Sequence, residues 1–250
     1  MAYRFAEDDA AGILIVGRNE KRAIEVSEKI NANGGKAHYC RTDVSKEDDC
    51  KRMVATAIDK WGRLDVLVNN AAKTNNQLDK GAMVADIDVW NQAFAVNVTG
   101  ALMCAKHALP HMIKQGGGVI LNSSSGLGQI ADTQWIGYSC SKAALARLGQ
   151  HIALAYGPHQ VRCVTMIIGL ISTPAQGGMI PPEIEKIMKS NILLGRLGRP
   201  EEIAALTSFL ASDDASFITG TTIEVTGGSQ SHPGHWAQMK EFAASNISID

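Results

Sequence analysis

The stretch Gly118-Val-Ile-Leu-Asn122, followed by Ser123-Ser-Ser125 and later by Tyr138-Ser-Cys-Ser-Lys142, decides the fold. Its apolar run has the length and composition of a buried β-strand, and the segment 138–156 has the periodicity of a helix. Similar strand and helix segments alternate along the rest of the chain. This alternation predicts an α/β protein with a parallel sheet covered by helices on both faces.

The other elements follow from the same patterns. Strands are predicted at 12–16, 36–41, 66–68, 118–122, 161–167 and 222–225. Helices are predicted at 2–8, after Asn19, after Ser45, across 88–115, at 138–156 and from Pro200. Ser45-Lys-Glu-Asp48 is interpreted as a capping box, and Gly62 as the end of the helix that it opens. Residues 1–228 are expected to form one domain, followed by a C-terminal tail at 229–250.

Composition limits the possible functions. The 250 residues are 45% hydrophobic, which is enough for one large core. The 24 basic and 25 acidic residues form no block of like charge, so nothing points to nucleic acid or to an anionic membrane as a partner. The five scattered cysteines, the charged N-terminal residues and the lack of a run of about 18–20 apolar residues predict a cytoplasmic protein without a signal peptide or membrane span.

Tyr138 and Lys142 are four residues apart on a predicted helix and therefore share one face. A free phenol has a pKa of about 10, and a neighbouring ammonium group lowers it toward the range useful for general acid/base catalysis. Alone, the spacing is a weak signal, because most such pairs lie on ordinary helix surfaces. Cys140, between them, should face elsewhere and is interpreted as a packing residue.

The surroundings of this pair carry more information. Ser125 follows a predicted strand, and the carboxyl end of a parallel strand is where such sheets place their ligands. Asn97 lies in Asn97-Val-Thr-Gly100, within the long helical region. Asn69-Asn-Ala-Ala72 comes directly after the strand at 66–68. With Tyr138 and Lys142, these residues resemble the short-chain dehydrogenase/reductase family.

The resemblance extends from Ala2 to about Gly228 and includes the segments 194–203, 217–220 and 225–228. It implies a doubly wound, Rossmann-type sheet and an oxidoreductase that transfers a hydride between a nicotinamide cofactor and a secondary alcohol or ketone. It also implies the catalytic roles. Tyr138 exchanges the proton, Lys142 lowers the pKa of the tyrosine and holds the nicotinamide ribose, Ser125 orients the substrate oxygen, and Asn97 supports a water in the proton relay.

The resemblance implies the cofactor contacts as well. Besides Tyr138 and Lys142, these are Asp43, Val44, Asn70, Ala71, Ile171 and Thr173. Relatives that prefer NAD place an acidic residue after the strand at 12–16, where this chain has Gly17 followed by Arg18. Arginine can pair with a 2′-phosphate, so NADP is the expected cofactor and NAD a possible one. The alternative is that Arg18 is only a solvated side chain at a strand end.

The chain departs from the family pattern mainly at its start. In relatives, a strand and a glycine-rich turn of the type T-G-x-x-x-G-x-G precede the segment that matches 2–10, and the turn holds the cofactor pyrophosphate. Without them, the strands at 12–16 and 66–68 lose their shared neighbour. One explanation is that the natural chain begins upstream of Met1. The other is a shortened protein that binds cofactor poorly and serves as a non-catalytic assembly or regulatory subunit.

The chain also departs from the family pattern at two single positions. Ala72 replaces the last glycine of the N-N-A-G motif, and Ile168 precedes Gly169 where relatives have proline. No metal site is expected. The apolar residues of the segment 174–194, which include Met179 and Ile180, suggest a lid over an apolar small-molecule substrate, unless the segment packs only on its own protein. A homo-oligomer, either a dimer or a tetramer, is expected from the resemblance.

Overall fold

The computed structural model describes residues 1–75, 77–173 and 181–246, and every pair of neighbouring strands in it is parallel. The strands are β1 (Ile13–Gly17), β2 (Ala37–Arg41), β3 (Val66–Asn69), β4 (Gly118–Ser125), β5 (Val161–Ile168) and β6 (Thr222–Val225). The α-helices are α1 (Ala2–Glu7), α2 (Glu20–Ala32), α3 (Glu47–Trp61), α4 (Ile87–Phe94), α5 (Ala101–Lys114), α6 (Ile136–Tyr156), α7 (Pro182–Ser190), α8 (Pro200–Ala211) and α9 (Trp236–Asn246). The predicted α/β class with a doubly wound, Rossmann-type sheet is confirmed.

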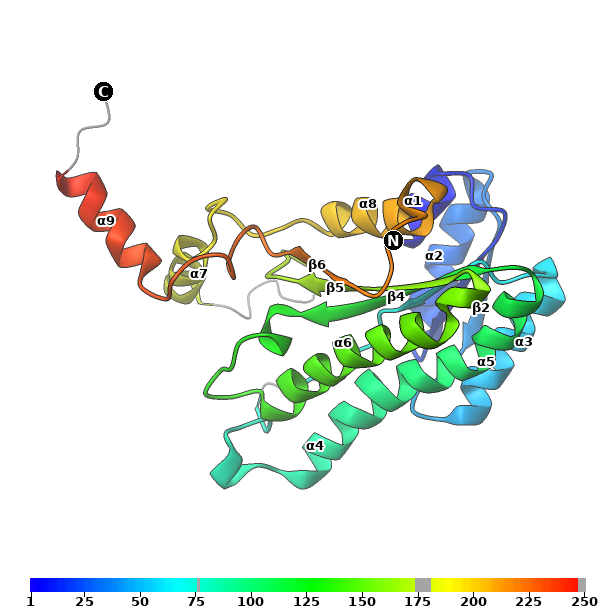
Figure 1. The fold of residues 1–250 in the computed structure, drawn as a ribbon, viewed down its shortest axis with the longest axis horizontal. Coiled ribbons are helices and arrows are strands. Elements are labelled where there is room, and N and C mark those ends of the chain that lie inside the picture. Colours follow the sequence, from blue (N-terminus) through cyan, green and yellow to red (C-terminus); the bar gives the residue numbers. More distant parts are fainter. Residues whose placement is uncertain (76, 174–180, 247–250) are drawn as a thin grey trace.

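Helices cover both faces of the sheet because successive strand residues point to opposite sides. Ile120 of β4 belongs to a buried cluster with side chains of α3, α5 and α6. Its neighbours Val119 and Leu121 belong to a second cluster that includes Leu210 of α8. Figure 1 shows α5 and α6 on one side of the central strands, and α8 with α1 on the other.

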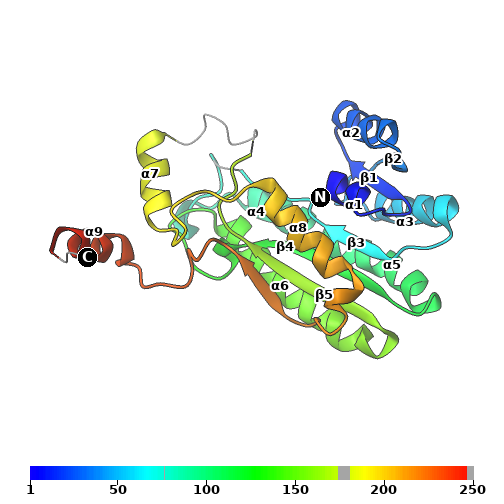
Figure 2. The same ribbon diagram turned by 90° about the horizontal axis from the view of Figure 1, so that it is seen from above.

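The described sheet consists of two parts. One part has the order β1-β2 and the other the order β3-β4-β5-β6. Among the described residues no strand is hydrogen-bonded to both β1 and β3, and Figure 2 shows these two parts of the sheet side by side. Val16 of β1 is 39% exposed, which is high for a central strand of a parallel sheet. The strand segments expected at 12–16 and 66–68 therefore do lack a common neighbour in the described part of the chain.

The helix ends agree with the sequence in two places and differ in a third. Asn19 caps α2 by accepting a hydrogen bond from the Arg22 backbone N–H at 3.0 Å, and Gly62 ends α3 in the left-handed conformation. The capping box predicted at Ser45 is wrong. The Ser45 hydroxyl instead donates to the carboxylate of Asp43 at 2.7 Å, and α3 begins two residues later, at Glu47. The Ser45 side chain therefore bonds within the loop before the helix, and Lys46 is the N-cap residue of α3.

The long helical region predicted at 88–115 is interrupted. A π-helical turn at Ala95–Gly100 separates α4 from α5 and contains Asn97. Such turns are rare and occur mostly at functional sites. Strand β4 is longer than predicted, because Ser123, Ser124 and Ser125 continue its pairing with β5. Ser125 is therefore the last residue of a strand.

The C-terminal part contains two helices that were not predicted, α7 and α9. On α7, Ile184 and Ile187 are 43% and 58% exposed. Met179 and Ile180, which the lid hypothesis also includes, lie outside the described residues. Figure 1 shows α9 apart from the sheet, at the end of the molecule away from the N-terminus. Among the helices that the structure describes, none has the length and apolar character needed to cross a lipid bilayer.

Candidate active site

Tyr138 and Lys142 lie on the first two turns of α6, next to the carboxyl end of β4. The Lys142 Nζ is 5.6 Å from the centre of the Tyr138 ring. Lys142 is 2% exposed, and its Nζ donates a hydrogen bond to the Ser123 carbonyl oxygen at 2.6 Å. The Ser124 hydroxyl in turn donates to the Lys142 carbonyl at 2.8 Å. The strand end and the start of the helix are thus joined through the lysine.

The ionisation of the pair differs from the sequence-based expectation. Burial raises the pKa of the Tyr138 phenol, and a hydrogen bond with Ser125 opposes this effect. Burial also lowers the pKa of Lys142 to about 8. The Lys142 amine is directed to the Ser123 carbonyl, and burial has the largest effect on the pKa of the tyrosine in this structure. The expected lowering was inferred from spacing alone, which ignores desolvation.

Ser125 connects the strand to the tyrosine. Its hydroxyl accepts a hydrogen bond from the Leu127 backbone N–H at 3.3 Å and interacts with the Tyr138 phenol. Ser125 is only partly buried, in contrast to Ser123 and Ser124. A hydroxyl in this position can donate to a substrate oxygen that also contacts the phenol.

Asn97 is 1% exposed and connects the backbone of Lys73 to Ser141 on α6. Its Oδ1 accepts from the Lys73 backbone N–H at 2.7 Å, and its Nδ2 donates to the Lys73 carbonyl at 3.2 Å. The same Nδ2 donates to the Ser141 hydroxyl at 2.9 Å, and that hydroxyl donates to the Tyr138 carbonyl at 2.7 Å. Both amide hydrogens are therefore occupied, and one lone pair of Oδ1 remains for a further partner.

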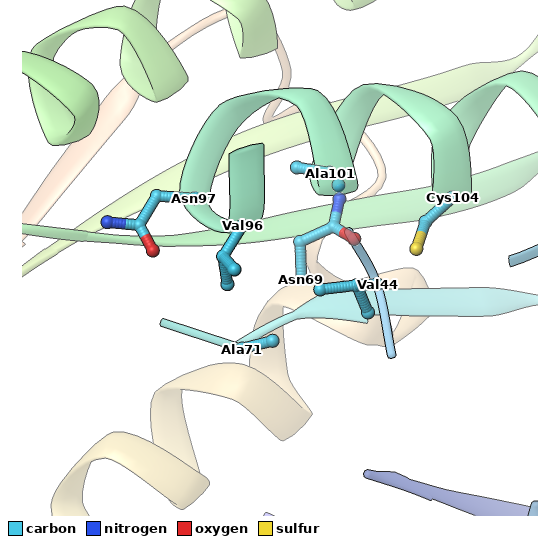
Figure 3. A pocket seen from close by; sticks show the side chains of 8 residues that line it. Val44, Asn69, Ala71, Val96, Asn97, Ala101 and Cys104 are labelled. Atoms are coloured by element: carbon cyan, nitrogen blue, oxygen red, sulfur yellow. The ribbon is translucent and has the colours of Figure 1, made fainter. Parts of the chain in front are cut away.

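A small cavity lies between the end of β3 and the π-helical turn. Figure 3 shows Asn97, Val96 and Cys104 on the helical side of this cavity, with Asn69, Val44 and Ala71 on the side where β3 ends. Two of the predicted cofactor contacts, Val44 and Ala71, thus share a cavity with the predicted catalytic Asn97. Asn70, which follows β3, is exposed at the same edge.

The remaining predicted cofactor residues are more dispersed. Arg18 is exposed directly after β1 and is close enough to Asp43 to lower the pKa of that carboxyl, although hydrogen bonds from Ser45 have the larger effect. Ile171 pairs with Gly198 beyond the end of β5. No hydrogen bond of the described residues joins Ile171 or Thr173 to the Tyr138–Lys142 pair.

The sequence pattern missed two side chains that fix Tyr138, namely Ser141 and Asp79. Ser141 is completely buried, and Asp79 is 4% exposed. Asp79 comes from the segment between β3 and α4, so its sequence position gives no sign of its contact with α6. Cys140 does face away from the tyrosine but is exposed, so its interpretation as a packing residue is wrong. Within the described parts of the chain, no group of three or more potential ligands could hold a metal ion.

These features define an oxidoreductase-type site on a doubly wound sheet, and known proteins share them. The family model described as enoyl-(acyl carrier protein) reductase matches residues 1–230. A 7alpha-hydroxysteroid dehydrogenase of Clostridium sardiniense is 36% identical over 220 residues, which are 88% of this chain and 84% of the relative. Cis-4-hydroxycyclohexanecarboxylate dehydrogenase of Sinomonas cyclohexanicum is 35% identical over 227 residues, 91% of this chain and 89% of the relative.

Solved structures agree in fold. A 7 alpha-hydroxysteroid dehydrogenase complexed with NADH and 7-oxo glycochenodeoxycholic acid has a TM-score of 0.82 and 31% identity, covering 87% of this chain and 84% of its own. A gluconate 5-dehydrogenase from Burkholderia cenocepacia J2315, in complex with NADP and tartrate, has a TM-score of 0.86 and 25% identity, covering 93% and 90%. The chain belongs to the short-chain dehydrogenase/reductase family and is an oxidoreductase by descent.

Proposed function

We propose that this protein transfers a hydride between a nicotinamide cofactor, with NADP preferred, and a secondary alcohol or ketone. The observation that carries the proposal is the meeting of Tyr138, Lys142 and Ser125 at the carboxyl end of β4. The two relatives described above are named dehydrogenases of hydroxylated compounds, and the two solved neighbours contain NADH and NADP. An apolar small molecule is the preferred substrate class, because Ile184 and Ile187 are exposed on α7.

The residues present fit such a cofactor at three places. Lys142 and Tyr138 would hold its nicotinamide ribose, and Val44, Asp43, Asn70 and Ala71 would line its adenosine side, next to the small cavity. Ile171 and Thr173 would contact the carboxamide end. When bound, the cofactor supplies or accepts the hydride.

The side chains of the protein handle the proton. The Tyr138 phenol gives a proton to a ketone oxygen, or takes it from an alcohol, while the Ser125 hydroxyl donates a hydrogen bond to the same oxygen. Lys142 supports the phenol from inside the protein, and its amine, with a pKa of about 8, can itself exchange a proton near neutrality. Asn97 keeps the loop at Lys73 and the start of α6 together and has one lone pair left for a water.

The test of this assignment is Tyr138→Phe, which removes the hydroxyl and keeps the ring. We expect turnover of a ketone panel with NADPH to fall by at least about 100-fold, the lower end of the usual range for acid/base groups, with an unchanged circular dichroism spectrum. Tyr156→Phe, at the other end of the same helix, is the matched control and should keep wild-type activity. Wild-type turnover by Tyr138→Phe would remove the tyrosine from the mechanism.

Cofactor preference depends on Arg18, which is exposed at the end of β1. Charge-assisted hydrogen bonds contribute about 1.5–3 kcal/mol, so Arg18→Gln should weaken NADPH binding by about 10-fold or more and leave NADH binding unchanged. Fluorescence titration measures both. Arg22→Gln, an exposed arginine on the neighbouring α2, should change neither affinity. Tighter binding of NADH than of NADPH by the wild-type protein would contradict the NADP preference.

A second candidate function is favoured by the discontinuity of the sheet between β1 and β3. A family member with a poorly supported cofactor site would serve as a non-catalytic assembly or regulatory subunit. It would show no binding of NADPH or NADH at millimolar concentration and would copurify with a catalytic partner.

For the enzyme, we further propose a cytoplasmic location and a homo-oligomeric state, either a dimer or a tetramer. Sedimentation velocity would give the mass of the oligomer. The proposal treats residues 1–228 as the catalytic domain and 229–250 as a tail.

A further inference from the structure

Asp79 is a buried carboxylate whose two oxygens are both used at the start of α6. Oδ1 accepts a hydrogen bond from the Gly137 backbone N–H at 2.8 Å, and Oδ2 accepts from the Tyr138 backbone N–H at 2.9 Å. The Asp79 carbonyl also accepts from the Trp135 N–H at 2.9 Å. The first N–H groups of a helix have no partner within the helix. Asp79 therefore supplies the cap that the N-cap residue itself, Trp135, does not provide.

The chain has an unusual conformation at this point. Trp135 has a φ of 62°, the left-handed region that a bulky residue rarely adopts. A side-chain carbon on Gly137 would lie 3.2 Å from the Trp90 Cα and 3.4 Å from the Asp79 Oδ1. Strained backbone persists only where its surroundings fix it, and it is concentrated at functional sites. The contacts with Asp79 are such a constraint.

Tyr138 is consequently held on both of its peptide groups by side chains. Its N–H binds Asp79, and its C=O accepts from the Ser141 hydroxyl, which Asn97 holds in turn. Helix ends otherwise fray by one or two residues. Since Tyr138 is only the third residue of α6, fraying of this turn would move the phenol away from Ser125 and Lys142.

We propose that Asp79 is a positioning residue for the proton-transfer step. Its carboxylate holds the first turn of α6 so that the Tyr138 phenol meets Ser125 and Lys142 in a fixed geometry. The negative charge at the start of the helix also interacts favourably with the helix dipole. The inference rests on the proposed function, but the contacts themselves do not depend on it.

The test compares Asp79→Ala and Asp79→Asn with the wild-type protein. Alanine removes both acceptors, and asparagine keeps the shape but presents an amide N–H to one of the two backbone donors. Because a displacement of about 1 Å at a reacting group can cost about 100-fold, we expect kcat to fall 10- to 100-fold. KM and the NADPH dissociation constant should stay within about twofold, because both carboxylate oxygens of Asp79 are directed to backbone N–H groups of α6. Hydrogen–deuterium exchange at residues 135–139 should become faster in both variants.

Asp86→Ala is the matched control. Asp86 is the N-cap residue of the neighbouring helix α4, and its Oδ1 accepts from the backbone N–H groups of Asp88 and Val89 at 2.9 and 3.2 Å. It should speed exchange only at α4 and leave kcat unchanged.

An unchanged kcat in Asp79→Asn, or unchanged exchange at 135–139, would overturn the proposal. A large rise in KM with a constant kcat would do the same, because it would indicate a substrate contact. If Asp79→Ala fails to fold, the kcat and the exchange rates of Asp79→Asn decide whether the proposal holds. If the wild-type protein shows no turnover, the proposed function fails, whereas the exchange experiment still decides whether Asp79 holds the turn.

Discussion

Lys142 is an ionisable side chain in the interior of the protein. It is 2% exposed, it has one hydrogen bond to the Ser123 carbonyl, and burial lowers its pKa to about 8. An ammonium group in such a place has lost its water and is only partly compensated. The buried lysine therefore carries a stability cost, which its proposed catalytic role would explain.

The lowered pKa of Lys142 predicts how the free energy of unfolding depends on pH. Between pH of about 8 and 10.5, the unfolded chain keeps the Lys142 proton while the folded protein has lost it, so the contribution of Lys142 to stability rises with pH. Over this window the difference corresponds to about 3 kcal/mol. The free energy of unfolding of the wild-type protein, measured with urea, should increase relative to that of Lys142→Met by this order. A constant difference across the window would show that the pKa is not lowered.

The proximity of the proposed catalytic residues Tyr138, Lys142 and Ser125 could be predicted from the sequence, because their spacing is local. Tyr138 and Lys142 share a helix, and Ser125 ends the strand before it. The contacts of Asp79 and Ser141 with Tyr138 could not be predicted in this way. A buried aspartate between two elements has no distinguishing sequence pattern until the chain is folded. The expected lowering of the Tyr138 pKa was wrong for a related reason. Burial raises this pKa, and the extent of burial depends on all the elements around the ring.

At the scale of elements, α6 is fitted closely to the sheet. A side-chain carbon at Gly149 would lie 2.6 Å from the Thr165 Oγ1 of β5 and 3.0 Å from the Asn122 Nδ2 of β4. Both neighbours are buried, at 1% and 0% exposure, and cannot easily move away. A glycine in the middle of a helix is otherwise unfavourable, so close packing accounts for it.

Gly149→Ala should therefore lower the free energy of unfolding by about 1–3 kcal/mol, as overpacked positions do. Gly157→Ala is the control, because a side-chain carbon there meets no atom within 4 Å. That change should be neutral or stabilise by up to about 1 kcal/mol. Urea unfolding measures both, and equal effects would show that the contact with Thr165 and Asn122 relaxes at little cost.

Most elements could be predicted from periodicity, while their details could not. The π-helical turn at Asn97 keeps the apolar pattern of a continuous helix. Helix α7 is only 9 residues long, and α9 has a weak amphipathic pattern. The cap predicted at Ser45 was wrong because α3 begins only at Glu47, with Lys46 as its N-cap residue, and the Ser45 hydroxyl bonds to Asp43 in the preceding loop. Local signals predict the type of an element better than the partners of its end groups.

For the whole molecule, the two-part sheet has consequences for stability. Among the residues that the structure describes, β4 and β5 have partner strands on both sides, whereas β1 and β3 are each paired on one side only. Unpaired backbone groups at such an edge exchange with water more readily than those in a complete ladder.

Native-state hydrogen exchange should therefore show the amides of β1 and β3 that face each other exchanging much faster than the amides of β4 and β5. Fragments covering 13–17, 66–69 and 161–168 report the difference by mass spectrometry. Equal, slow exchange in all three fragments would show that this edge is paired in solution.

Cys140 has a practical consequence for studies of this protein. It is the exposed cysteine, while Cys40, Cys50, Cys104 and Cys163 are buried. A maleimide dye should consequently attach at one place, two residues from Tyr138 but on the other side of the helix. The emission of that dye would report movement of the first turns of α6 during turnover, without any change to the sequence.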